Sequence, residues 1–173
     1  MTGLVVALFG VTQPAVAQVE LGLDAGVQVI SFDTDFDSDN LTQIGIPVSN
    51  LRVGFFISPS VEIEPNFSLQ RASSGGSSAT EWDIGANLLY HFGDDPAMTR
   101  FFVAFGPSLV VASGGDETDS QFGVTVGAGV KIPASDLLLF RLGAGYTKFF
   151  EKENELVGLN VFTFLFGFSV MVE

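Results

Sequence analysis

The chain has 173 residues, of which 47% are hydrophobic, and it carries a formal net charge of −13. Seven Lys and Arg residues against 20 Asp and Glu cannot form the clustered cationic surface that nucleic acid requires, so nucleic acid is excluded as a partner. The absence of cysteine excludes a disulfide framework, thiol chemistry and a cysteine-ligated metal. A chain of one domain's length that is both strongly apolar and strongly acidic must place its apolar and its charged side chains in different regions of the fold.

The first 17 residues predict a secretory signal peptide. Residues 4–11 form an apolar core, and Ala15-Val16-Ala17 is a small-x-small cleavage site that leaves Gln18 as the expected mature start. No Lys or Arg precedes the apolar core, so we expect the signal to be truncated. The alternative is that residues 4–11 are a first strand. On the first interpretation, residues 18–173 form the mature domain.

After the signal, large apolar residues alternate with small or polar residues in eight segments separated by Gly, Pro, Ser, Asp and Asn. The apolar phase of the second segment changes near Ser49-Asn50, where a β-bulge would keep both halves on one face. The last segment has a large apolar residue at every even position. The eight expected strands are residues 19–30, 44–57, 61–71, 81–92, 101–113, 121–132, 137–150 and 162–172.

The connections between these strands are expected to alternate in length. Those at 58–60, 93–98 and 133–135 are short or contain tight-turn residues, whereas those at 32–43, 72–80, 114–120 and 151–155 are mostly longer and more polar. Short turns are typical of the periplasmic side of an outer-membrane barrel, and both chain ends would lie on that side. An even number of strands allows the sheet to close without an edge.

The composition of the two strand faces indicates which face meets lipid. The apolar face is uniform and bulky, with aromatic residues such as Trp82, Tyr90 and Phe101 toward strand ends, which is typical of a lipid-facing band. The other face combines glycines with isolated charges, which suits a narrow lumen. We therefore predict an all-β fold, an eight-stranded antiparallel up-and-down transmembrane β-barrel. A soluble periplasmic barrel that binds an apolar ligand inside is an alternative.

The alternating segments resemble those of the small eight-stranded outer-membrane barrels of the OmpA and OmpX kind. The likeness is carried by residues 122–131, 141–146 and 89–93, and it extends over about residues 19–172. It consists of residue classes rather than fixed residues, so it specifies architecture more than function. It implies a bacterial outer-membrane location, contact with lipid and lipopolysaccharide, and a porin-like barrel in a Gram-negative cell. The protein is expected to be a monomer.

The last strand also matches the family's C-terminal spacing. Gly167 is followed by apolar residues three and five positions later, at Val170 and Val172. Glu173 stands where the family usually has a terminal aromatic residue. The resemblance implies insertion by the barrel-assembly machinery, with an imperfect recognition signal.

Charges of both signs fall on the predicted lumen face. The interior of an eight-stranded barrel is only wide enough for side chains, so these charges predict a salt-bridged plug rather than a channel. Arg52, Glu64 and Arg141 are expected at a similar height because each lies a few residues from a turn on the same side. The predicted lumen charge network comprises Arg52, Glu62, Glu64, Glu81, Asp83, Lys131 and Arg141, with Glu20 and Asp24 on the same face.

His91 is the only histidine, so any Ser-His-acid site must include it. Some barrels that resemble this one modify lipid A with a histidine-containing site near the outer leaflet. His91 falls instead at the periplasmic end of the fourth predicted strand, which favours a hydrogen-bonded, structural histidine. We predict no catalytic residue, no enzyme activity and no cofactor; a lipid A-modifying enzyme on the same fold is the alternative.

The predicted extracellular loops hold ten acidic residues. Asp33, Asp35, Asp37 and Asp39 are similar to the first half of a calcium loop, but the glycine and the final glutamate of that loop are missing. We expect weak binding of divalent cations there and no dedicated metal site. The expected function is a structural or surface-interaction role for a barrel with a plugged polar lumen and acidic extracellular loops.

Overall fold

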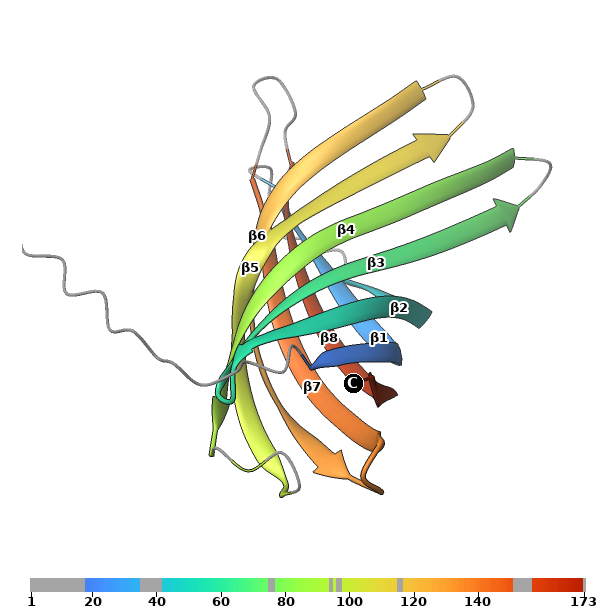
Figure 1. Ribbon diagram of the computed structural model, residues 1–173. Helices are drawn as coiled ribbons and strands as arrows, with labels where there is room; N and C mark the ends of the chain where they lie inside the picture. Colours follow the sequence, from blue (N-terminus) through green and yellow to red (C-terminus); the bar gives the residue numbers. More distant parts are fainter. Residues whose placement is uncertain are drawn as a thin grey trace, which may run out of the picture.

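Eight antiparallel strands close into one barrel (Figure 1), which confirms the predicted fold class. The computed structural model describes residues 18–34, 42–74, 77–93, 95, 98–114, 117–150 and 157–172. Each strand pairs with its neighbours in sequence, and β8 returns to pair with β1. Within the described ranges, no helix is long and apolar enough to span a bilayer. The strands are β1 (Val19–Thr34), β2 (Thr42–Ser58), β3 (Val61–Ser74), β4 (Ser77–Phe92), β5 (Arg100–Gly114), β6 (Glu117–Pro133), β7 (Leu138–Phe149) and β8 (Val157–Val172).

The closing seam between β1 and β8 places the two ends of the barrel chain together. The strands pair without interruption from Val19 opposite Val172 to Thr34 opposite Val157. Because the topology is up-and-down, the β2–β3, β4–β5 and β6–β7 connections lie at this same end. Gly93, which follows β4, has a φ of 102°, a left-handed conformation that glycine adopts without steric cost. We refer to this end as the chain-end side and to the other as the hairpin side.

The prediction of long loops at 72–80 and 114–120 is wrong, because the strands continue into both segments. β3 and β4 pair as far as Ser74 opposite Ser77, and β5 and β6 pair as far as Gly114 opposite Glu117. These two hairpins project beyond the rest of the barrel on the hairpin side (Figure 1). Their residues are small or polar on both faces, so they lack the alternation of large apolar residues that identifies a half-buried strand. Backbone pairing does not require that alternation.

The predicted bulge in the second strand exists, but it lies closer to the strand's start than Ser49-Asn50. Gly26 of β1 pairs with Val48 and Gln28 pairs with Gly45, so β2 has one extra residue between Gly45 and Val48. Pro47 falls in this interval and has no N–H group to give to the ladder. A bulge is one of the few places where a strand accommodates proline, which accounts for its position here.

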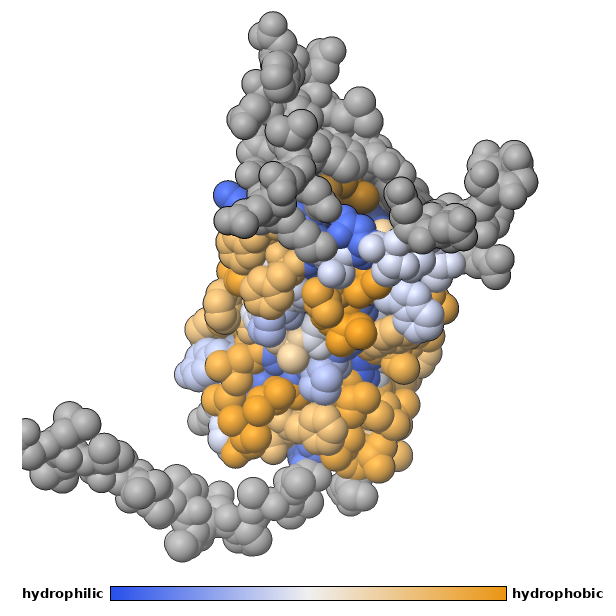
Figure 2. Space-filling view, turned by 90° about the horizontal axis from the view of Figure 1, so that it is seen from above, coloured by the Kyte–Doolittle hydropathy of each residue, from blue (hydrophilic) through white to orange (hydrophobic). Residues whose placement is uncertain are grey.

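Side chains alternate between an apolar outer surface and a lumen that holds the buried charges. Phe105 is 59% exposed and Phe166 is 62% exposed, whereas the inward-facing Phe102 of β5 is 3% exposed. Hydrophobic side chains cover most of the described outer surface in Figure 2. An interior lined by buried carboxylates and cations does not suit an apolar ligand. The alternative of a soluble barrel around such a ligand is therefore wrong.

Candidate functional site

A cluster of buried ionisable side chains lies in the lumen near the chain-end side. Its members come from six of the eight strands, and each of them is between 0% and 6% exposed. Four carboxylates face three permanent cations and one histidine, so a protonated histidine would make the cluster neutral. We call this set the lumen ion cluster: Glu20, Asp24, Arg52, Glu62, Glu64, His91, Lys131 and Arg141.

Arg52 connects three carboxylates from the strands on either side of it. Its Nε donates to Asp24 Oδ2 at 2.9 Å, and its Nη1 donates to Glu20 Oε1 at 2.5 Å and to Glu64 Oε2 at 3.3 Å. Its Nη2 donates to Ser169 Oγ at 3.3 Å. The guanidinium group has several donors in a fixed planar arrangement, which suits one residue to join β1, β3 and β8.

Lys131 crosses the lumen from β6 to reach the carboxylates of β1 and β3. Its Nζ donates to Glu20 Oε2 at 2.6 Å and to Glu62 Oε2 at 2.8 Å. His91 Nε2 lies 2.7 Å from the same Glu62 oxygen, while no described residue hydrogen-bonds His91 Nδ1. His91 is fully buried on the chain-end side. Its contacts suit a structural role in the cluster.

Arg141 of β7 completes the cluster on the side facing the hairpins. Its Nη1 donates to Glu64 Oε2 at 2.5 Å, and its guanidinium lies 4.6 Å from the centre of the Phe102 ring. Phe56 has a similar role, because Lys131 Nζ lies 5.5 Å from its ring centre. Aromatic faces attract cations, so these two rings hold the cationic groups from the side that the carboxylates leave open.

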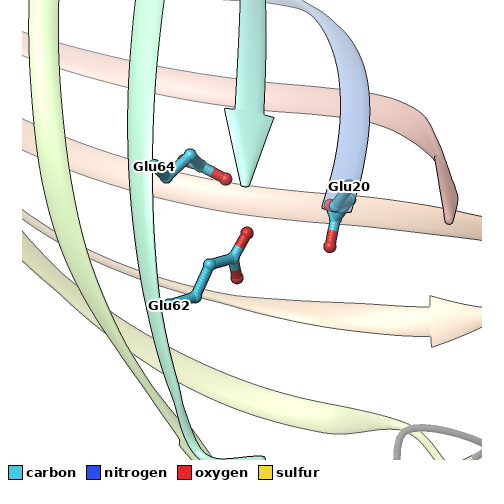
Figure 3. A group of neighbouring side chains, drawn as sticks. All are labelled: Glu20, Glu62 and Glu64. Carbon is cyan, nitrogen blue, oxygen red and sulfur yellow. The ribbon is translucent and has the colours of Figure 1, made fainter. Parts of the chain in front are cut away.

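The three glutamates at the centre point toward one another (Figure 3). Oxygen atoms of Glu20, Glu62 and Glu64 lie within 4.8 Å of each other, a spacing that a metal ion could bridge. Lys131 Nζ and the Arg52 and Arg141 guanidinium groups already bond to these oxygens. A metal would have to displace them, so the chemistry of this donor set favours an ion-paired plug over a metal site.

Glu81 and Asp83 of β4 face the lumen but lie apart from the lumen ion cluster. Neither makes an ion pair with any residue that the structure describes; Asp83 Oδ1 accepts a hydrogen bond from Ser108 Oγ at 2.9 Å. Both line a cavity of about 150 Å³ on the hairpin side of the cluster, which we call the lumen cavity. Arg141 lines the same cavity. The lumen thus has a packed half and a hollow half.

Three residues of this region do not figure in the lumen predicted from the sequence. Phe56 and Phe102 are buried beside cationic side chains, and Arg100 is 3% exposed with its Nη1 donating to Pro59 O at 3.1 Å. A signal for all three exists in the sequence, because each lies in the lumen phase of its strand. Phe56 and Phe102 were missed because large aromatic residues suggest the lipid face, and Arg100 was missed because the predicted fifth strand starts one residue after it.

Of the four aspartates with the calcium-loop spacing, only Asp33 lies within the described residues. Asp33 lies in β1, where its backbone pairs with Gly158 of β8. Asp35, Asp37 and Asp39 lie outside the described residues. The expected weak cation binding in this segment therefore stays a prediction. The predicted signal peptide, residues 1–17, also lies outside the described part of the chain.

The barrel is similar to several solved outer-membrane proteins. Neisserial surface protein A is 15% identical, with a TM-score of 0.65, over 87% of this chain and 96% of that chain. Ail, the attachment invasion locus protein of Yersinia pestis, is 11% identical, with a TM-score of 0.55, over 90% and 99%. The N-terminal barrel domain of Pseudomonas aeruginosa OprF is 15% identical, with a TM-score of 0.57, over 90% and 98%. At these identities the similarity establishes the fold alone.

No curated protein sequence matches the chain. A protein-family comparison gives a match over nearly its whole length: residues 3–171 match the outer membrane protein beta-barrel domain. This match agrees with the closed eight-stranded barrel and with its apolar outer surface. The chain therefore belongs to the outer membrane protein beta-barrel domain family and is located in the bacterial outer membrane.

Proposed function

We propose that the protein is a non-conducting outer-membrane barrel with a structural or surface-interaction role. The observation that carries this proposal is the lumen ion cluster, whose side chains reach across the barrel from β1, β2, β3, β4, β6 and β7. An eight-stranded barrel has room for side chains and little else, so a set of mutually bonded side chains leaves no continuous aqueous path. Ions would have to break several buried ion pairs to pass.

The projecting hairpins support the surface-interaction part of the proposal. β3–β4 and β5–β6 continue beyond the other strands on the side opposite the chain ends (Figure 1). In outer-membrane barrels the end with the longer extensions is extracellular. The two hairpins are paired along their described length, and the residues near their ends are small or polar in the sequence. This arrangement suits contact with a partner outside the cell or with lipopolysaccharide.

The enzymatic alternative receives less support from the site. His91, the chain's only histidine, is fully buried on the chain-end side, and its Nε2 is engaged by Glu62. A lipid A-modifying histidine would have to reach lipid at the outer leaflet, which is the hairpin side. We therefore propose that the protein is not an enzyme. Mass spectrometry of lipid A from cells with and without the protein should show identical species; a new lipid A species in its presence would support the enzyme.

The remaining partners are proposed from the resemblance to small outer-membrane barrels. We propose that the barrel-assembly machinery inserts the chain, that its outer surface contacts lipid and lipopolysaccharide, and that it is a monomer. The apolar outer surface supports the lipid contact, since its exposed hydrophobic residues come from all eight strands rather than forming one patch that a second copy could cover.

Planar-bilayer recording of the full chain tests the plugged lumen. We expect no stable open level, because the buried ion pairs block the path through the lumen. Insertion is verified in parallel by co-flotation with lipid vesicles and by protease resistance of the barrel, so that a silent membrane is not mistaken for an empty one. A stable, ion-selective open level in most insertions would overturn the proposal and favour a porin.

A further inference from the structure

The outer surface of the barrel carries one cation whose side chain the structure describes. The other described cationic side chains are buried in the lumen: Arg52, Arg100, Lys131 and Arg141. Lys148 of β7 is exposed and alternates with Leu142 and Tyr146, so it lies on the lipid-facing side of the strand. No described residue forms an ion pair with Lys148. A cation on this surface must reach polar groups at the edge of the apolar band.

The strand registers give the depth of Lys148 in the membrane. Following paired residues once around the barrel from Val19 of β1 leads back to Val29 of the same strand, ten residues nearer the hairpin side. With a strand tilt of 35–45°, this stagger raises each successive strand by about 3 Å along the barrel axis. Tyr146 is two strands beyond Phe105 on one row of pairs, and Lys148 is two residues farther toward the hairpin side. Lys148 therefore lies about 11 Å above Phe105.

This depth corresponds to the boundary between lipid and water on the hairpin side. Phe105 lies five residues after the start of β5, near the middle of an apolar band about 25 Å tall. A position about 11 Å higher is therefore close to the upper edge of that band. The hairpin side is the extracellular end, so Lys148 is at the level of the headgroups of the outer leaflet.

Aromatic side chains surround Lys148 on the outer surface. Tyr146 precedes it by two positions, and Phe150 follows it by two positions and is 48% exposed. The Phe150 ring stacks on Phe122 of β6, with ring centres 6.1 Å apart. The Tyr146 ring lies 4.8 Å from the Phe162 ring of β8, centre to centre. Aromatic residues collect where a bilayer meets water, which agrees with the depth from the registers.

Asn160 of β8 places a second hydrogen-bond donor beside Lys148. The two residues are directly opposite each other in the β7–β8 register, so their Cβ atoms are about 5 Å apart. Tyr146 Oη donates to Asn160 Oδ1 at 2.7 Å, which orients the amide group and leaves its N–H donors unused by any described residue. An ammonium group next to a free amide N–H₂ group provides donors only, which suits an anion with several oxygen atoms.

We propose that Lys148 and Asn160 bind a phosphate group of an outer-leaflet glycolipid of the lipid A class. Lys148 Nζ donates a charge-assisted hydrogen bond to one phosphate oxygen, and Asn160 Nδ2 donates to another. The acyl chains of the lipid lie against Phe162 and Leu142, which are exposed on the same face at lower levels. This inference rests on the proposed contact with lipopolysaccharide and does not depend on whether the lumen conducts.

Other ligands suit the pair less well. The phosphate of a zwitterionic phospholipid is already compensated by the ammonium group of its own headgroup. Phospholipids of the inner leaflet would meet the chain-end boundary, where no described cation faces outward. A free phosphate ion would gain only the two hydrogen bonds, whereas a lipid in contact with the barrel holds its phosphate at high local concentration. An anionic lipid of the outer leaflet meets all of these requirements.

Native mass spectrometry of the full chain, released from a maltoside detergent that contains no phosphate, tests the proposal. Lipid A is compared with the same lipid after removal of its phosphate groups. We expect the parent protein to bind the dephosphorylated lipid at least about tenfold more weakly than lipid A. Lys148→Gln should weaken lipid A binding at least about fivefold, because it removes the charge and keeps a polar side chain. Lys148→Arg keeps the charge and should retain binding.

Two controls make the result specific. Gln18→Glu makes the same change in net charge on the chain-end side and should leave lipid A binding unchanged. Inorganic phosphate at roughly 10 mM, above the millimolar class, should not displace lipid A; displacement would overturn the lipid assignment in favour of a soluble anion. The proposal is also overturned if Lys148→Gln binds lipid A like the parent, or if the dephosphorylated lipid binds equally well. Those two outcomes leave the general contact with lipopolysaccharide intact, whereas a parent protein that retains neither lipid contradicts both.

Discussion

Replacing Arg52 by methionine is expected to lower the free energy of unfolding of the barrel by about 3–5 kcal/mol, the range for removing one partner of a buried ion pair. The reason is that removing Arg52 leaves one of its three carboxylate partners without any other ion pair. Glu20 keeps Lys131, and Glu64 keeps Arg141, but Asp24 has no other ion-pair partner among the described residues. Asp24 is 1% exposed, so its charge would be left buried and unpaired. Urea unfolding in lipid vesicles measures the difference.

A second substitution distinguishes this explanation from simple loss of packing. Arg52→Met combined with Asp24→Asn should be more stable than Arg52→Met alone, because the unpaired charge is gone. Lys148→Met removes the same charge from an exposed position of β7 and should change stability by no more than about 0.5 kcal/mol. The single variant Asp24→Asn completes the comparison. If the losses in free energy of unfolding of Arg52→Met and Asp24→Asn add up to the loss in the double variant, Arg52 does not stabilise the barrel through this ion pair.

Phe105→Arg on the outer surface is expected to destabilise the barrel by about 2–4 kcal/mol in lipid. Phe105 is 59% exposed and lies five residues after the start of β5. With a rise of about 3.4 Å per residue and a tilt of 35–45°, it is about 13 Å above that start, near the middle of an apolar band about 25 Å tall. An arginine at this depth must either leave water or distort the bilayer.

Phe101 provides a matched control on the same strand and the same face. It is 64% exposed and lies one residue after the start of β5, near the expected lipid–water boundary. Phe101→Arg should therefore cost about 0–1 kcal/mol. Equal costs at the two positions would mean that depth along β5 does not correspond to depth in a bilayer. The comparison uses the same urea unfolding in vesicles.

The sequence predicted the strands most accurately where one face is apolar. The last strand alternates without interruption, and its core was predicted correctly, although β8 starts earlier, at Val157. The outer parts of β3 and β4 were missed because their residues, such as Ser73 and Ser78, are small or polar on both faces. Period-two reasoning detects burial of one face, and water surrounds both faces of a hairpin that projects from the membrane. The backbone pairing itself leaves no such pattern.

Side-chain partners in the lumen could be predicted only in part. The alternation indicates that Arg52, Glu64 and Lys131 point inward, but it does not give the stagger between strands. Lys131 of β6 meets Glu20 of β1 and Glu62 of β3 across the lumen. Such contacts depend on how far neighbouring strands are shifted along the barrel axis. The same stagger places Glu81 and Asp83 above the lumen ion cluster rather than in it, and no feature of their own strand indicates this.

The alternation of apolar and polar residues along the strands places one face of the barrel wall against lipid and the other face around an ion-paired lumen. Fluorescence of a single tryptophan tests it directly, because the chain has only one, Trp82. Trp82→Phe combined with Phe105→Trp places the only tryptophan at an outward position near mid-bilayer. The variant is reconstituted in vesicles whose phospholipids carry bromine atoms along the acyl chains. Parallel samples without bromine receive iodide in the aqueous phase. The structure predicts strong quenching by the brominated chains and little by iodide; quenching by iodide without quenching by bromine would contradict it.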